Sequence, residues 1–308
     1  MSTGLISHPA CLAHDPGPDH PECPDRLRAV RQALEDEAFA LLDRARATPA
    51  SEAQLLRVHS AAHVARILAI RPEAGRRVQI DPDTMMSAGS AEAAVLAAGG
   101  AVAAVEAVLA GRMRNCFVAV RPPGHHAGPQ TAEGFCLFNN AAIAAAHARA
   151  VGLKRVAIVD FDVHHGNGTQ DIVAADPTMF YGSSHQAGAY PGTGFAEETG
   201  VGNIVNTPLR AGTDGAGFRA AWHERILPAL DAFCPELLII SAGFDAHRAD
   251  PLAQLRLGND DFAWITRALM EVAETHASGR VVSVLEGGYD LDALAASAAA
   301  HVRALMEG

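Results

Sequence analysis

Side chains that could hold a metal ion or transfer a proton gather in four short segments of this 308-residue chain. The segments are RPPGHH (121–126), DFDVHHGNG (160–168), SAGFDAH (241–247) and EGGYD (286–290). Each directly follows an apolar run of the kind that forms a strand buried on both faces. In open α/β sheets, ligands bind in the crevice beyond the carboxyl ends of the strands. The four segments therefore predict one polar site at a single edge of a sheet.

The second segment has the residue types of a metal site. Alternate residues of an extended chain share a face, so Asp162 and His164 can bind one cation while His165 points the other way. Asp245, at the end of another apolar run, is the natural third ligand. Carboxylate and imidazole are zinc ligands, and a catalytic zinc keeps three protein ligands and one open position. Taken alone, the same residues also fit a strand end with solvated carboxylates.

Acid/base and oxyanion groups are the next candidates. The adjacent His125 and His126 follow a glycine-bearing turn and could form an acid/base pair, although a structural role is an equal alternative. Tyr289 follows two glycines, and its hydroxyl could stabilise an oxyanion. A tyrosine that only packs at a helix start is the commoner case. Arg26, after the stiff turn HPECPD, could bind a carboxylate product or be a surface charge.

The elements that must position these groups alternate along the chain. Apolar, β-branched runs predict strands at 116–120, 155–159, 178–182, 203–206, 237–240 and 281–285. Helical patterns cover 140–150, 216–233, 259–277 and 291–306. Alternating strands and helices predict a mainly parallel sheet with helices on both faces. The length and a hydrophobic content of 49% allow one large α/β domain or two small ones.

Charge and cysteine content narrow the functional classes. The formal net charge of -11 argues against non-specific binding to nucleic acid or to anionic membranes. Five widely spaced cysteines without a CxxC pair make a disulfide framework or a cysteine-based zinc site unexpected. The apolar stretch 93–111 contains Glu106 and indicates a buried helix rather than a membrane span. The segment MSTGLISHPA lacks the pattern of a secretory signal, so we expect a cytoplasmic enzyme.

Six segments together resemble the histone deacetylase superfamily, which includes bacterial deacetylase-like amidohydrolases and acetylpolyamine amidohydrolases. They are RPPGHHA (121–127), GFCLFNN (134–140), DFDVHHGNGTQ (160–170), YPGTG (190–194), SAGFDAHRADPL (241–252) and EGGY (286–289). The resemblance implies an arginase-like α/β fold with a central sheet of about eight strands, and a single catalytic domain over residues 1–308. It also implies hydrolysis of an acylated amine such as acetyl-lysine or an acetylated polyamine.

Carried over residue by residue, the resemblance assigns roles. One zinc ion is placed on Asp162, His164 and Asp245. His126 is the general base and acid, and His125 is its electrostatic partner. Tyr289 is the oxyanion donor.

Further roles follow from the same resemblance. Asp160 bonds His125 and also belongs to a buried monovalent-cation site, for potassium or sodium, with Ser183 and Ser184. The residues expected to touch substrate or product are Phe135, Tyr190, Gly134, Gly288, Leu252 and Arg26.

Two positions indicate a class II-like deacetylase with an apolar entrance. Asn167 stands where class I deacetylases carry an aspartate, and a neutral partner should leave the pKa of His126 lower. Leu252 stands where polyamine-specialised enzymes can carry an acidic residue. Other acidic residues, including Asp81 and Asp83, could supply that function from positions that the sequence does not fix. Three alternatives remain at this stage: an arginase-like two-manganese hydrolase, a catalytically inactive binding module, and hydrolysis of another small-molecule amide. A homo-oligomer is also compatible with the sequence.

Overall fold

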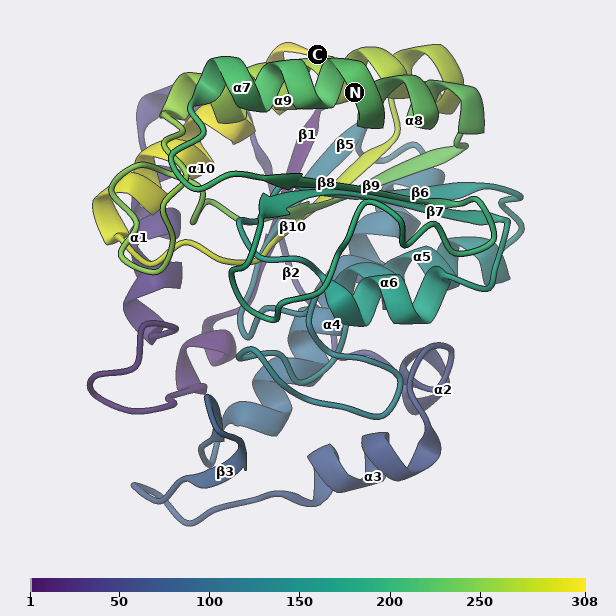
Figure 1. Cartoon of the computed structure of the whole chain (residues 1–308). Coiled ribbons are helices and arrows are strands. Elements are labelled where there is room, and N and C mark those ends of the chain that lie inside the picture. The colour runs from purple at the N-terminus through teal and green to yellow at the C-terminus, as the bar shows by residue number, and fades with distance from the viewer. Residues whose placement is uncertain (1) are drawn as a thin grey trace.

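A central parallel sheet organises the computed structural model, which describes residues 2–308. Its eight strands lie in the order β2-β1-β5-β10-β9-β6-β7-β8, and every neighbouring pair is parallel. Helices cover both faces, which makes three layers (Figure 1). The strands are β1 (Thr3–Ser7), β2 (Asp43–Arg46), β5 (Asn115–Ala119), β6 (Val156–Asp160), β7 (Met179–Gln186), β8 (Ile204–Leu209), β9 (Leu237–Ala242) and β10 (Val281–Leu285).

All six predicted strands are present, and two strands of the sheet were missed. All four residues of β2, DRAR, are exposed at the sheet edge, and the strand carries no apolar pattern. β1 has only five residues, TGLIS, and its burial comes from its neighbours β2 and β5. A separate antiparallel hairpin pairs β3 (Val78–Asp81) with β4 (Thr84–Met86).

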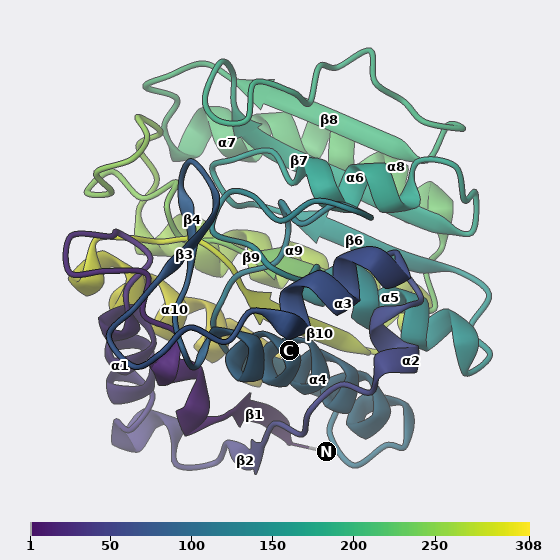
Figure 2. The ribbon, with the colours of Figure 1, turned by 90° about the horizontal axis from the view of Figure 1, so that it is seen from below.

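The helices fall into two groups. On one face α10 packs against both α1 and α9, and α8 and α7 contact α9. On the other face α4 packs against α5, and α5 contacts α6 (Figures 1 and 2). The helices are α1 (Pro24–Ala33), α2 (Glu52–Leu55), α3 (Ala61–Ala69), α4 (Ser90–Leu109), α5 (Asn140–Ala150), α6 (Asn167–Val173), α7 (Gly215–Ala221), α8 (Leu227–Phe233), α9 (Asn259–Ala277) and α10 (Leu291–Glu307).

Helix α4 is the one described helix that is long and apolar enough to cross a membrane by length and composition. Most of its residues are buried inside the fold, as the sequence predicted. Its Ala- and Gly-rich surface allows close packing: a Cβ on Gly99 would lie 1.8 Å from the carbonyl oxygen of Thr48. The apolar stretch is therefore a core helix of the α/β fold.

The helix predicted over 216–233 is interrupted. A π-helical turn, η3 (Trp222–Ile226), lies between α7 and α8. Pro228 has no N–H to donate, and its ring would clash with the carbonyl one turn earlier, so the backbone widens here. The turn also lets the indole N–H of Trp222 donate to Ser184 Oγ at 2.9 Å.

The four strands that precede the polar segments are adjacent in the sheet, in the order β5-β10-β9-β6. The chain passes from β5 to β6 and later fills the two positions between them with β9 and β10. Such a break in strand order opens a crevice at the carboxyl edge. The four polar segments therefore meet at one place, as their positions in the sequence predicted.

Candidate active site and metal centre

Three buried side chains form a compact ligand cluster beyond β6 and β9. His164 Nδ1 lies 3.1 Å from Asp162 Oδ1 and 3.1 Å from Asp245 Oδ2. Tetrahedral coordination with bonds of about 2.0 Å requires ligand atoms roughly 3.3 Å apart. The exposed fractions of the three residues are 0%, 8% and 1% for Asp162, His164 and Asp245. The cluster therefore fits one small metal ion.

Backbone hydrogen bonds hold these ligands in place. The sequence predicted an extended chain over residues 160–164, but the segment after β6 is bent. In this bend His164 N donates to Asp162 Oδ1 at 2.9 Å, and Val163 N donates to Asp245 Oδ1 at 2.8 Å. Gly287 N donates to Asp162 Oδ2 at 2.8 Å. The carboxylates are thus oriented before any ion binds.

The charges of the cluster favour a cation. Burial opposes protonation of His164, but its hydrogen bonds to Asp162 and Asp245 and their negative charges outweigh this and raise its pKa to about 10. Burial and the charge of Asp162 raise the pKa of Asp245 to about 7. Two buried carboxylates that face one imidazole therefore attract a cation, and a divalent ion would compete with protons for these ligand atoms.

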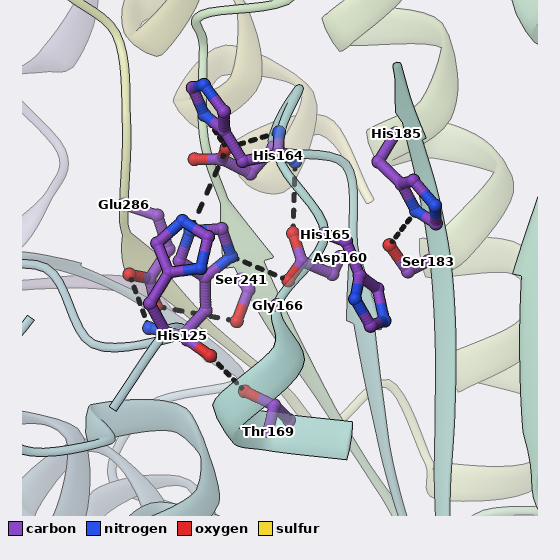
Figure 3. A network of polar contacts seen from close by, with 12 residues as sticks. His125, Asp160, His164, His165, Gly166, Thr169, Ser183, His185, Ser241 and Glu286 are labelled. Carbon is purple, nitrogen blue, oxygen red and sulfur yellow. Dashed lines mark hydrogen bonds and ion pairs between the residues drawn. The ribbon is translucent and has the colours of Figure 1, made fainter. Parts of the chain in front are cut away.

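His125 and His126 lie side by side with opposite environments. Their ring centroids are 4.0 Å apart. His125 Nδ1 donates to Asp160 Oδ2 at 3.0 Å (Figure 3). Burial disfavours the His125 cation, but Asp162 and Asp160 outweigh it and raise its pKa to about 10. Burial and the charges of His125 and His164 hold the pKa of His126 well below 6.5. Such a divided pair is typical of acid/base sites.

His126 forms a hydrogen bond with Asn167, the residue that stands where class I deacetylases carry an aspartate. Its Nδ1 lies 2.8 Å from Asn167 Oδ1, at the start of α6. Its ring centroid lies 6.0 Å from that of the ligand His164. His126 is only 3% exposed and is therefore shielded from bulk water.

Glu286 anchors the histidine loop, and the sequence reasoning gave it no role. Its Oε2 accepts from Gly124 N at 2.6 Å and from His125 N at 3.2 Å (Figure 3). Burial raises its pKa to about 7 against the opposing effect of His125. A carboxylate directly after the apolar run of β10 was the available signal, because such a group needs buried partners.

Aromatic rings surround the histidine pair. The Tyr190 ring centroid lies 5.0 Å from that of His126 and 6.4 Å from that of His164. The ring centroids of Phe135 and Tyr289 are 5.8 Å apart. Tyr190 is 40% exposed, so this group extends from the buried cluster to the surface. These contacts bring together the residues expected to form the substrate tunnel and the oxyanion donor.

Gly134 is required by close approach. Its φ is +56°, and a Cβ there would lie 2.4 Å from Cδ2 of His126. Its N–H donates to Asp83 Oδ1 at 3.2 Å, so Asp83 on the β3–β4 turn lies beside the tunnel. The sequence could not place Asp83, because the hairpin that carries it comes from a distant part of the chain.

A buried charge cluster supports Tyr289 from behind. Arg26 is fully buried and donates to the carbonyl of Gly288 at 2.5 Å, to that of Glu286 at 2.5 Å and to Glu22 at 3.0 Å. Its guanidinium lies 4.9 Å from the centroid of Tyr289. Every nitrogen of Arg26 thus has a protein acceptor, and its contact with a carboxylate product stays a prediction.

Other predicted residues are placed as follows. His165 points away from the metal cluster and bonds Thr193 Oγ1 at 2.8 Å, as expected. Ser183 lies opposite Asp160 in the β6–β7 register, and its Oγ bonds His185. Leu252 is 40% exposed. It lies two residues after Asp250, whose Oδ2 accepts from Tyr289 N at 2.7 Å. The monovalent-cation site of Asp160, Ser183 and Ser184 stays a prediction.

Comparison with known proteins agrees with this geometry. The profile of the histone deacetylase domain matches residues 20–305. A protein named probable deacetylase from Archaeoglobus fulgidus is 40% identical over 95% of this chain and 82% of its own length. The histone deacetylase-like amidohydrolase of Pseudomonas aeruginosa is 41% identical over 93% of this chain and 75% of its own length. The crystal structure of the HDA15 HD domain matches with a TM-score of 0.94 at 37% identity, covering 99% of this chain and 88% of that one. This chain therefore belongs to the histone deacetylase family, as a deacetylase-type hydrolase with that family's arginase-like fold.

Proposed function

We propose that this protein is a zinc-dependent deacylase that removes an acetyl or related acyl group from an amine such as acetyl-lysine. The observation that carries the proposal is the buried Asp162–His164–Asp245 cluster beside His126, whose pKa is held well below 6.5 by burial and nearby positive charge. Two acidic ligands and one imidazole suit a zinc site with one open position. A zinc ion held there would polarise the amide carbonyl and lower the pKa of water towards about 7.

His126 performs the proton transfers. Its Nδ1 is bonded to Asn167, so Nε2 is free to accept a proton from the attacking water. The same nitrogen then returns the proton to the leaving amine. His125, whose pKa is raised by the charges of Asp162 and Asp160, would keep positive charge beside His126 as negative charge develops on the substrate.

Tyr289 donates a hydrogen bond to the oxyanion. Burial and nearby Asp245 hold its pKa well above 10, against the opposing charge of Arg26, so the hydroxyl keeps its proton as a donor requires. Asp250 fixes its backbone and Arg26 packs over its ring. Phe135 and Tyr190 would flank the apolar stem of an acyl-lysine side chain.

An acetylated polyamine is the second candidate. Asp83 and Glu133 lie close enough to Tyr190 that, after burial, their charges are the main causes of its raised pKa. Negative charge at the rim would attract a second ammonium group. The exposed apolar Leu252 provides no such partner, which favours acyl-lysine.

Metal analysis, the Tyr289→Phe variant and a substrate panel test these proposals. We expect one zinc per chain in both wild type and Tyr289→Phe, with kcat of the variant lower by about 10² to 10³. An active Tyr289→Phe variant would exclude the oxyanion role. The panel compares acetyl-lysine peptides, acetylated putrescine and spermidine, and longer acyl-lysines. A roughly 100-fold preference for the polyamines, or about 2.7 kcal/mol, would overturn the substrate assignment.

A further inference from the structure

Glu133 is a carboxylate linked to His126 through Asn167, and the proton transfers described above do not use it. It begins a tight turn in which Cys136 N donates to Glu133 O at 2.9 Å. The two central residues of this turn, Gly134 and Phe135, have φ of +56° and +68°. The turn therefore carries the tunnel wall, and Glu133 stands at its base.

Glu133, Asn167 and His126 form a chain of side-chain hydrogen bonds. Asn167 Nδ2 donates to Glu133 Oε1 at 2.6 Å. Asn167 Oδ1 in turn lies 2.8 Å from His126 Nδ1. Among residues 2–308 no arginine or lysine pairs with Glu133, so Asn167 is its one side-chain partner there.

The direction of this chain of hydrogen bonds is set by chemistry. An ionised carboxylate only accepts hydrogen bonds, whereas an amide donates from nitrogen and accepts at oxygen. The NH₂ of Asn167 must therefore face Glu133, and its oxygen must face His126. His126 Nδ1 then has to carry the proton, which leaves Nε2 as the basic nitrogen.

The reverse orientation would be inactive. With its NH₂ towards His126, Asn167 would require an unprotonated Nδ1, and the proton would move to Nε2. A neutral histidine with its proton on Nε2 cannot accept a second one from water at that position. An asparagine can adopt both orientations, whereas an aspartate at this position could only accept.

We propose that Glu133 is a positioning residue that fixes the amide orientation of Asn167 and thereby the Nδ1-protonated, reactive tautomer of His126. The inference rests on the proposed function, in which His126 is the base. It explains how a neutral asparagine can act as the hydrogen-bond partner of His126. An aspartate in that place would accept with either oxygen and would need no second residue to orient it.

Double-mutant kinetics separate this role from a merely structural one. In the wild-type background, Glu133→Ala should lower kcat on the order of tenfold with little change in KM, because a hydrogen bond to a charged group is lost. Glu133→Gln keeps an acceptor oxygen but can also turn its NH₂ towards Asn167, so it should recover only part of kcat. In the Asn167→Asp background, position 167 can only accept, and Glu133 would face another carboxylate. There Glu133→Ala should leave kcat unchanged or raise it.

The tautomer itself is measured by 15N NMR of the histidine rings in the zinc-loaded protein, with His126 assigned by comparison with His126→Ala. Wild type should show protonated Nδ1, whereas Glu133→Ala and, to a smaller extent, Glu133→Gln should show a mixture of tautomers. An equal loss of kcat from Glu133→Ala in both backgrounds, or a wild-type tautomer in that variant, would overturn the proposal. If the wild type hydrolyses no amide, the proposed function fails, but the NMR result still decides the role of Glu133.

Discussion

Substituting Gly287 with alanine should remove the metal site without unfolding the protein. An added Cβ would lie 2.1 Å from Asp245 Oδ2 and 2.6 Å from Asp162 Oδ2, whereas ordinary contact begins near 3.4 Å. The Asp245 oxygen would therefore have to retreat by about 1.3 Å, which far exceeds the tolerance of about 0.2 Å in metal–ligand distances. Gly287 is not among the glycines with positive φ, so the backbone itself accepts alanine.

The expected loss of metal affinity is at least about 100-fold, the upper end for changes that only disturb ligand orientation. A zinc concentration of 100 Kd stabilises the wild type by about 2.7 kcal/mol, and this gain should almost vanish in Gly287→Ala. The assay is competition with a chromogenic chelator, together with thermal unfolding with and without zinc. Gly258→Ala is the matched control, because its added Cβ has no neighbour closer than 4.0 Å. Wild-type zinc affinity in Gly287→Ala would refute the assigned ligand geometry.

Three further outcomes are expected. Glu22 is buried between Arg121 and Arg26, and although burial raises its pKa, Arg121 and the other partners lower it well below its usual 4.5. Its stabilising effect is therefore present above pH 4.5 and is lost as the pH falls below that value. In urea unfolding, the free energy of unfolding of Glu22→Gln should fall less steeply below pH 4.5 than that of wild type. An equal slope in the two proteins would contradict this. Glu22→Ala should lower the free energy of unfolding by about 3–5 kcal/mol, because it leaves buried arginine charges unpaired, and a loss below 1 kcal/mol would count against the cluster. Leu252→Glu should raise kcat/KM for acetylated spermidine relative to an acetyl-lysine peptide by about two- to fivefold, the size of a solvent-exposed ion pair, and an unchanged ratio would remove Leu252 from the entrance.

The sequence by itself determined the central strands and the ends at which the chemistry sits. Strands β5, β6, β9 and β10 are buried on both faces, so their apolar runs are visible without any tertiary information. Polar groups directly after such runs lie at the edge of the sheet, because the chain leaves the sheet where the strand ends. This is why Asp162, His164 and Asp245 could be proposed as a set, and the structure brings these three together.

Only the tertiary structure decided which groups support that set. The edge strand β2 has four exposed residues, and its place depends on pairing with β1 rather than on its own pattern. Glu286, Glu133 and Glu22 are carboxylates with partners far away in the sequence. Gly124 is 162 positions from Glu286, Asn167 is 34 positions from Glu133, and Arg121 is 99 positions from Glu22. A sequence records that a carboxylate is present, but its hydrogen-bond partner exists only once the sheet has brought distant loops together. The candidate ligands are therefore visible in the sequence, whereas their orientation and the hydrogen bonds of His126 are properties of the fold.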